Sequence, residues 1–301
     1  MTRRALKAWP LLLVAFLASP LCAAQADPVG SDPRPDAAHP PQLREMSLPS
    51  HGATLYGVYY QAAGSGPHPT VLMLHGFAGF EQNEDLAQAL RRGGFNVLIF
   101  HYRGAWGSQG TYTFAHCIED TQAVLAYLRE PANASRMRVD PQRLVLIGHS
   151  VGGQVAGIVA ARDPGVLGIG MISAANRRLA MARPGWDAQA SVHFKEGAGP
   201  LHGANGRALA AEQRAHARDW DLVELAPRWQ GRAVLVVSSD DAFRDEADAI
   251  SAAARASDPG KLTEVHLVTD HAYSGQRVAL AQALVSWLDG FTAAAGAAAG
   301  R

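Results

Sequence analysis

The chain has 301 residues, of which 48% are hydrophobic and 18% charged, and its formal net charge at pH 7 is zero. This length and composition suit one soluble α/β domain with a complete hydrophobic core. The balanced charge, without a dense run of Lys or Arg, argues against a nucleic-acid-binding protein, which would carry a basic patch or stripe.

Residues 1–26 have the features of a secretory signal peptide. Basic residues precede the apolar run LLLVAFLASPL, and Ala24-Gln25-Ala26 supplies the small residues of a cleavage site. A retained membrane anchor is the competing interpretation, but the run is shorter than the ~20 residues that a span requires, and Pro20 interrupts it. We therefore expect a periplasmic or secreted protein without stable membrane insertion after cleavage. Cys117 then remains as its lone cysteine, which excludes an intramolecular disulfide.

The two ends of the remaining chain predict little regular structure. Residues 27–50 are rich in Pro, Asp and Ala, which is typical of a flexible leader. Residues 293–301 are low in complexity, which predicts a disordered tail. The folded domain is expected over residues 51–292.

Inside this domain the pattern alternates between strands and helices. Residues 54–60 alternate apolar and short side chains, as an antiparallel strand does. Continuous apolar runs predict strands that are covered on both faces, at residues 70–77, 95–104, 143–150, 166–175, 232–239 and 261–271. Helical spacing appears between them, at residues 85–94, 117–130, 151–163, 246–257 and 276–291. Repeated β-α units imply a mostly parallel sheet with helices on both faces.

Residues 176 to about 228 break this alternation. They contain Trp186, Trp220, three histidines and several glycines, with only a modest helical pattern. A long excursion within a compact domain is more often functional than idle, so we expect a small cap inserted before the strand at residues 232–239.

Ser150 is the candidate nucleophile. Gly148-His149-Ser150-Val151-Gly152 matches G-x-S-x-G and lies between a predicted buried strand and a predicted helix. In that setting the serine projects from a sharp turn, and the glycines let strand and helix come together. A tight turn with an incidental serine is the alternative interpretation.

A serine hydroxyl needs a base, and the base needs an orienting acid. His271 lies just past the last predicted strand and is the candidate base, whereas His266 lies within that strand and is expected to be structural. Asp240 and Asp241 directly follow the strand at residues 232–239. We prefer Asp241 as the acid, with Asp240 as the alternative, and the other of the two is expected to cap the following helix.

The reaction also needs amide donors for a developing oxyanion. The N–H of Val151, directly after the nucleophile, is one candidate, and the N–H of Phe77 is the other because Gly76 lets that loop turn towards the site. His75 is expected to bind loop backbone, and the loop at residues 103–108 is expected to buttress the oxyanion loop. The histidines of the cap lack metal-ligand spacing, and neither a metal nor a cofactor is expected.

Taken together, these residues resemble the α/β-hydrolase superfamily. The matching motifs cover roughly residues 50–292, in the order HGFAG (75–79), FHYRGAWGSQG (100–110), GHSVGG (148–153), SSDD (238–241) and DHAYS (270–274). They are most similar to dienelactone-hydrolase-like and peptidase-like members, although a serine stands where dienelactone hydrolases carry cysteine and no propeller domain precedes the fold. The resemblance implies an eight-stranded, mostly parallel sheet and catalysis through an acyl-enzyme.

The function expected from these features is hydrolysis of a small-molecule carboxylic ester by a Ser-His-Asp triad. The same triad could serve an amide, peptide or thioester hydrolase, and a non-catalytic binding protein that kept the fold is a third hypothesis. Acyl and alcohol preference are set by the shapes of cap and pocket, which the sequence does not give.

Overall fold

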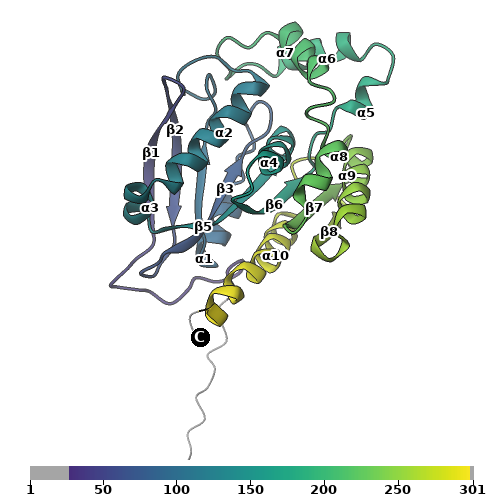
Figure 1. Ribbon diagram of the computed structural model, residues 1–301. Coiled ribbons are helices and arrows are strands. Elements are labelled where there is room, and N and C mark those ends of the chain that lie inside the picture. The colour runs from purple at the N-terminus through teal and green to yellow at the C-terminus, as the bar shows by residue number, and fades with distance from the viewer. Residues whose placement is uncertain (1–26, 299–301) are drawn as a thin grey trace, which may run out of the picture.

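Eight strands form one sheet at the centre of the protein (Figure 1). The computed structural model describes residues 27–298. The signal peptide predicted for residues 1–26 and the last three residues of the predicted tail lie outside the described residues.

The sheet is mostly parallel, with strand order β1-β2-β4-β3-β5-β6-β7-β8. Its strands are β1 (Gln42–Ser50), β2 (Ala53–Gln61), β3 (His68–Leu74), β4 (Asn96–Phe100), β5 (Val139–His149), β6 (Val166–Ile172), β7 (Ala233–Ser239) and β8 (Leu262–Leu267). Only β1 and β2 pair antiparallel, β1 with β2 and β2 with β4. The carboxyl ends of β3 and β5 to β8 therefore meet at one edge of the sheet, which is where ligands bind in such sheets.

The central strands carry continuous apolar runs because helices cover both of their faces. In β3, Val71 and Met73 pack into one core cluster, while Leu72 and Leu74 pack into the other. This follows from the period of two in a strand, which sends successive side chains to opposite faces. The continuous apolar runs in the sequence thus correctly predict strands buried on both sides.

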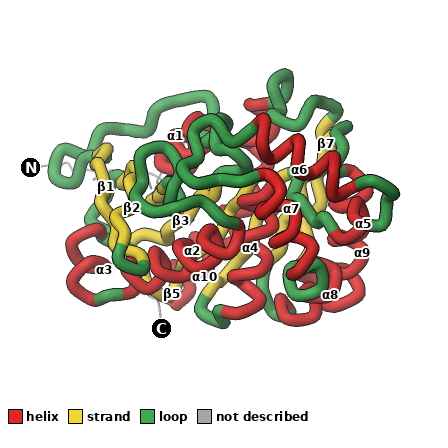
Figure 2. Tube along the Cα trace, turned by 90° about the horizontal axis from the view of Figure 1, so that it is seen from above, coloured by secondary structure: helices red, strands yellow, loops and turns green. Residues whose placement is uncertain are grey.

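Two helical layers enclose the sheet (Figures 1 and 2). One face carries α1 (Glu84–Arg92) and α10 (Arg277–Ala298), which share a core cluster with the strands. The other face carries α2 (Phe114–Arg129), α3 (Pro131–Met137), α4 (Val151–Arg162), α8 (Leu222–Leu225), η1 (Ala226–Trp229) and α9 (Arg244–Ser257). The short η2 (Pro259–Lys261) leads from α9 into β8.

The prediction of a flexible leader over residues 27–50 is wrong for residues 42–50. Its last nine residues form β1, in which Met46, Leu48 and Ser50 are buried and alternate with exposed neighbours. β1 and β2 are joined by His51 and Gly52, both with positive φ, as a two-residue hairpin turn requires. Earlier residues are also held in place, because the Arg92 guanidinium donates to the carbonyl oxygen of Pro28 at 2.6 Å.

The prediction of a disordered tail from residue 293 is wrong as far as residue 298, because α10 continues to Ala298. Its run of alanines favours a helix. Within residues 27–298, no helix combines the length and the apolar character needed to cross a membrane.

The segment between β6 and β7 contains helices and no named strand within the described chain. α5 (Arg178–Met181), α6 (Trp186–Glu196) and α7 (Gly206–Ala215) stand over the carboxyl edge of the sheet (Figures 1 and 2). α8 and η1 return to the helical layer and pack on α4 and α9. We call residues 178–215 the cap helices.

Candidate active site

Ser150 lies in a sharp turn between β5 and α4. Its backbone has φ 56° and ψ −118°, a left-handed conformation that is strained for a serine. A Cβ on Gly148 would lie 2.0 Å from the carbonyl oxygen of Gly152, and a Cβ on Gly152 would lie 2.1 Å from that of Leu74. Only glycine therefore allows strand, turn and helix to approach this closely.

The structure brings Asp241 to His271. Nδ1 of His271 and Oδ2 of Asp241 are 2.6 Å apart, so the ring donates a charge-assisted hydrogen bond to the carboxylate. Asp241 follows β7, and His271 lies in the loop after β8. The carboxylate is nearly buried, with 6% of its side chain exposed, whereas the imidazole is 37% exposed and accessible to a substrate.

Hydrogen bonds keep Asp241 ionised in this buried position. Burial by itself raises the pKa of its carboxyl, but hydrogen bonds from His271, Ser173 and the N–H of Phe243 outweigh burial and lower the pKa to about 2. The charge on Asp241 is therefore present over the whole range in which the protein would work.

Asp240, the alternative acid, points elsewhere. Its side chain is 53% exposed and pairs with Nε2 of His266 at 3.2 Å and with Arg244 at 3.5 Å. His266 also contacts the hydroxyl of Ser238, so both residues belong to a surface network away from Ser150. Asp240 does not cap α9 either, because that helix begins after Phe243 without a side-chain cap.

The imidazole of His271 lies between two aromatic rings. The sequence alone did not predict either contact. The ring of Phe243 lies 4.9 Å from it, and the ring of His149 lies 4.6 Å from it. Nε2 of His149 donates to the carbonyl oxygen of His271 at 2.8 Å. The residue before the candidate nucleophile thus fixes the backbone of the candidate base, a contact between loops that no local motif signals.

The loop after β3 places an amide beside Ser150. A Cβ on Gly76 would lie 3.0 Å from Cβ of Ser150, so this loop passes directly over the candidate nucleophile. Phe77 follows in that loop, and Val151 is the first residue of α4, whose N–H has no partner within the helix. The indole N–H of Trp106 donates to the carbonyl oxygen of Ala78 at 2.8 Å, so the loop after β4 buttresses this turn as predicted.

His75 and His149 are buried and neutral. Nδ1 of His75 is 2.8 Å from the carbonyl oxygen of Gly76, which matches the expected backbone role. Burial lowers the pKa of each ring to about 4, with the nearby imidazoles of His101 and His271 adding to the effect on His75 and His149 respectively.

Because His75 and His149 are buried in the neutral form, we expect the protein to lose stability in mild acid. Both folded-state pKa values lie below the ordinary value of 6.5, so the unfolded chain binds more protons between pH 6.5 and 4. The free energy of unfolding should fall from pH 7 to 5, by up to about 2 kcal/mol per ring. Urea titrations should show this slope, and His75→Asn and His149→Gln should each flatten it. Equal slopes in all three proteins would contradict the assignment.

Ser150 and His271 line one cavity of about 340 Å³. Its walls come from the loops after β3, β5 and β8, and its lining residues are Gly76, Phe77, Gly79, Phe80, Glu81, His149, Ser150, Asp270, His271 and Ala272. The candidate nucleophile, the candidate base and the loop expected to hold the oxyanion therefore open onto the same space.

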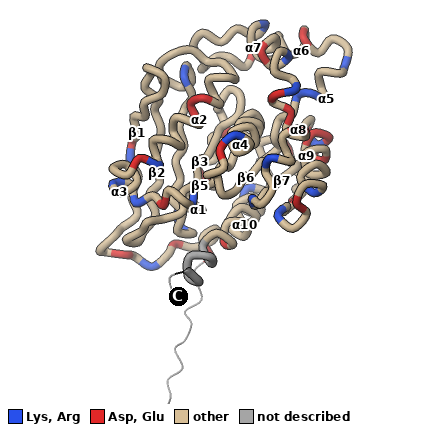
Figure 3. The backbone as a smooth tube through the Cα atoms, in the orientation of Figure 1, with Lys and Arg blue, Asp and Glu red and all other residues tan. Residues whose placement is uncertain are grey.

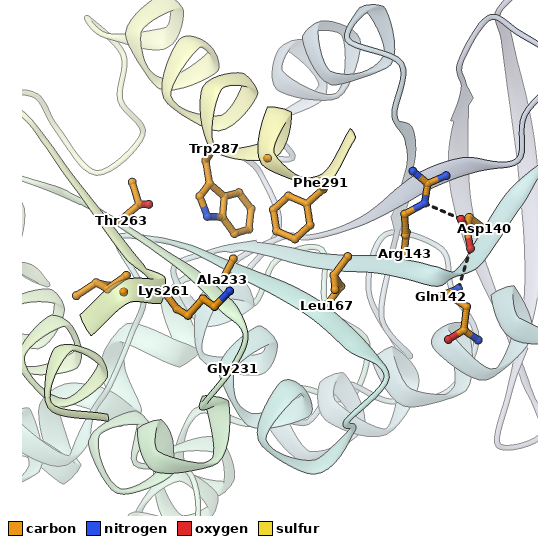
Figure 4. A pocket seen from close by; sticks show the side chains of 13 residues that line it. Asp140, Gln142, Arg143, Leu167, Gly231, Ala233, Lys261, Thr263, Trp287 and Phe291 are labelled. Carbon is orange, nitrogen blue, oxygen red and sulfur yellow. Dashed lines mark hydrogen bonds and ion pairs between the residues drawn. The ribbon is translucent and has the colours of Figure 1, made fainter. Parts of the chain in front are cut away.

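A larger depression of about 860 Å³ lies at the opposite edge of the sheet, where β6, β7 and β8 begin (Figure 4). Trp287 and Phe291 of α10 face Leu167 and Ala233 across it, and the Arg143–Asp140 pair lies at one end. Its described lining residues include no Ser, Cys or His, so the geometry favours the smaller cavity for chemistry. Among residues 27–298, no three His, Cys, Asp or Glu side chains are grouped to hold a metal ion.

Comparison with known proteins agrees with this architecture. Residues 71–283 match the model of the alpha/beta hydrolase family. The chain belongs to the alpha/beta hydrolase family.

Solved structures of esterases share the fold. EstE1, a carboxylesterase cloned from a metagenomic library, superposes with a TM-score of 0.61 at 21% identity, covering 83% of this chain and 90% of EstE1. The esterase of the archaeon Pyrobaculum calidifontis gives a TM-score of 0.60 at 17% identity, covering 85% and 88%. At such identities the likeness concerns the fold.

Sequence relatives match over shorter stretches. The uncharacterized protein YfhR of Escherichia coli K12 is 40% identical over 85 residues, which are 28% of this chain and 28% of YfhR. The match thus spans less than a third of the relative's length.

Proposed function

We propose that this hydrolase cleaves carboxylic esters of small molecules through an acyl-enzyme. The observation that carries the proposal is the 2.6 Å hydrogen bond between His271 and Asp241, on a histidine that shares one cavity with the strained Ser150. The esterase neighbours support an ester as the substrate class.

In the first half of the reaction, Oγ of Ser150 attacks the ester carbonyl carbon while Nε2 of His271 takes the hydroxyl proton. Asp241 holds the ring with Nδ1 protonated and stabilises the imidazolium that forms. The N–H groups of Phe77 and Val151 donate to the carbonyl oxygen as it becomes negative. The C–O bond to the alcohol then breaks, and His271 gives the leaving oxygen its proton.

In the second half, a water molecule attacks the acyl carbon and His271 takes its proton. The bond to Ser150 breaks, the acid leaves, and the proton returns to Oγ. The dipole of α4, whose first residue is Val151, favours the negative charge in both halves.

Ser150→Ala should abolish turnover of p-nitrophenyl butyrate and labelling by a fluorophosphonate probe, because both need the nucleophile. Ser257→Ala, at the end of α9, is the matched control and should keep both activities. Labelling of the Ser150→Ala protein at the wild-type level would show that another residue is the nucleophile.

Amides, peptides and thioesters are the alternative substrates for the same triad. A matched set of ester, amide and thioester with one acyl group, compared by kcat/KM, separates these possibilities. The ester should be cleaved fastest, since an amine is the poorer leaving group. Resistance of the purified protein to the fluorophosphonate would instead favour a non-catalytic binding protein.

We also propose that the protein is exported, on the strength of residues 1–26. The mass of the mature protein, which should begin at Asp27, reports this cleavage. An intact N-terminus in the mature protein would contradict it.

A further inference from the structure

Arg177 is a cation without a bonded counterion beside the catalytic residues. Its guanidinium carbon lies 5.1 Å from the centre of the Phe194 ring and 5.6 Å from that of Phe243, so two aromatic rings hold it in place. Nε of Arg177 is buried without a hydrogen-bond partner, and the residue as a whole remains partly exposed. Within residues 27–298 it forms no ion pair.

The neighbouring arginines of the cap differ in this respect. Arg178 pairs with Asp221 at 2.7 Å and with Glu224 at 2.9 Å. Figure 3 shows basic and acidic segments side by side between α5 and α8. Arg214 likewise pairs with Asp187. Carboxylates are thus available in this region, yet Arg177 is left unpaired.

None of the charged and titratable groups near Arg177 forms an ion pair with its guanidinium within the described chain. Burial lowers its pKa to about 10, and the charge of Glu246 and the hydroxyl of Tyr112 act in the opposite direction. Oε2 of Glu246 is itself buried without a partner, and burial raises the pKa of that carboxyl. His193 also lies near, and burial and Arg177 lower its pKa. Arg177 therefore remains a cation at neutral pH that lacks a bonded partner.

Both rings that hold Arg177 also touch the catalytic machinery. Phe243 lies 4.9 Å from the ring of His271, and Phe194 lies 5.2 Å from the ring of Phe77, whose N–H is the proposed oxyanion donor. Arg177 follows β6, the strand next to β5 and Ser150. Arg177 is the N-cap residue of α5, one ring away from the candidate base and from the oxyanion loop, and it stands behind the residues that line the 340 Å³ cavity.

Acidic side chains on the other side of the site already have a cationic neighbour. Glu81 and Asp270 line the 340 Å³ cavity, and the carboxylate of Glu81 lies 3.8 Å from the guanidinium of Arg277. Arg177 has no such ion pair within the described chain, so a negative group on the ester is attracted to the side of Arg177.

We propose that Arg177 binds a carboxylate carried by the ester substrate, on the part that lies beneath the cap helices. This inference rests on the proposed function and names its substrate class, a monoanionic carboxylic ester. A planar guanidinium fixed between rings presents its N–H groups as a fork that matches a carboxylate. A buried unpaired charge destabilises a fold, so the cost is offset when a ligand supplies the partner.

Two matched ester pairs test the proposal. p-Nitrophenyl hemiglutarate against p-nitrophenyl pentanoate places the carboxylate on the acyl part, and 3-carboxyphenyl butyrate against phenyl butyrate places it on the alcohol. The measured quantity is the ratio of kcat/KM for the anionic over the neutral ester. In one pair, Arg177→Met should lower this ratio by about 10- to 100-fold, as for a lost hydrogen bond to a charged group.

Two further variants define the effect. Arg177→Lys keeps the charge but not the planar fork, and its ratio should fall between those of wild type and Arg177→Met. It also carries the comparison if circular dichroism shows that Arg177→Met does not fold. Arg183→Met removes an exposed cap arginine and should leave the ratio at the wild-type value.

A readout without turnover separates this inference from the proposed function. Calorimetry with the inactive Ser150→Ala protein should show the preferred anionic ester binding at least about 10-fold more weakly once Arg177→Met is added. Equal ratios for wild type and Arg177→Met in both pairs, with equal binding, would overturn the role of Arg177. Turnover of the neutral esters that disappears in Ser150→Ala would still uphold the proposed function.

Discussion

Asp241→Asn should lower kcat for p-nitrophenyl butyrate by about 10⁴-fold, the loss seen when the acid of a Ser-His-Asp triad is made neutral. Asp241 accepts from Nδ1 of His271 at 2.6 Å, which leaves Nε2 unprotonated and able to take the proton of Ser150. An asparagine can instead donate to Nδ1, and the ring proton then sits on Nε2. In that tautomer His271 cannot act as the base.

Asp240→Asn is the matched control, one residue away on the same chain. Its carboxylate is exposed and serves Arg244 and His266, so the substitution should leave kcat within about twofold of wild type, as for a surface change away from the site. Steady-state kinetics on both proteins decide the question. Equal losses in the two variants, or a large loss in Asp240→Asn alone, would transfer the role of the acid to Asp240.

The choice between these two aspartates marks the limit of what the sequence could decide. Consecutive residues at the end of an extended strand point in opposite directions, so a shift of one position exchanges a buried carboxylate for an exposed one. The sequence shows that two acids follow β7. The packing of the β7 and β8 loops decides which of them faces His271.

The central strands were predictable for the opposite reason. A strand covered on both faces needs a continuous apolar run, and residues 144–148 of β5, all buried, form one. The turn at Ser150 was predictable too, because only a sequence with Gly148 and Gly152 can bend so tightly between strand and helix.

β1 was missed because it lies at the edge of the sheet. Only every second side chain in it is buried, and its sequence contains Arg, Glu and Pro, which also characterise linkers. The buried positions, Met46, Leu48 and Ser50, do follow a period of two, and the pair His51-Gly52 suits a hairpin turn. That alternation, followed by a turn sequence, was the feature from which β1 could have been predicted.

The contacts around His271 and Arg177 could not be predicted from local patterns. Phe243 and Phe194 come from segments far apart in the chain, and their rings meet Arg177 only after the cap helices fold over the sheet. Such contacts depend on tertiary packing, which a single sequence does not report.

Asp120→Ala should lower the free energy of unfolding by about 3–5 kcal/mol, the cost of removing one partner from a buried ion pair. Asp120 is fully buried in α2, and it accepts hydrogen bonds from the N–H of Arg103 at 2.7 Å, from Nε of Arg103 at 2.6 Å and from the hydroxyl of Ser50 at 2.5 Å. One carboxylate thus joins α2 to the loop after β4 and to the end of β1.

The same loop carries Trp106, whose indole supports Ala78 in the oxyanion loop. Loss of Asp120 should therefore lower the temperature at which ester turnover is lost together with the temperature of unfolding. Asp187→Ala is the control, because Asp187 pairs with Arg214 on the surface with 61% of its side chain exposed, and exposed pairs contribute about 0–1 kcal/mol. Urea unfolding of both variants measures the difference. An Asp120→Ala protein as stable as Asp187→Ala would mean that Glu119, which also contacts Arg103 at 2.5 Å, is a sufficient partner for that guanidinium.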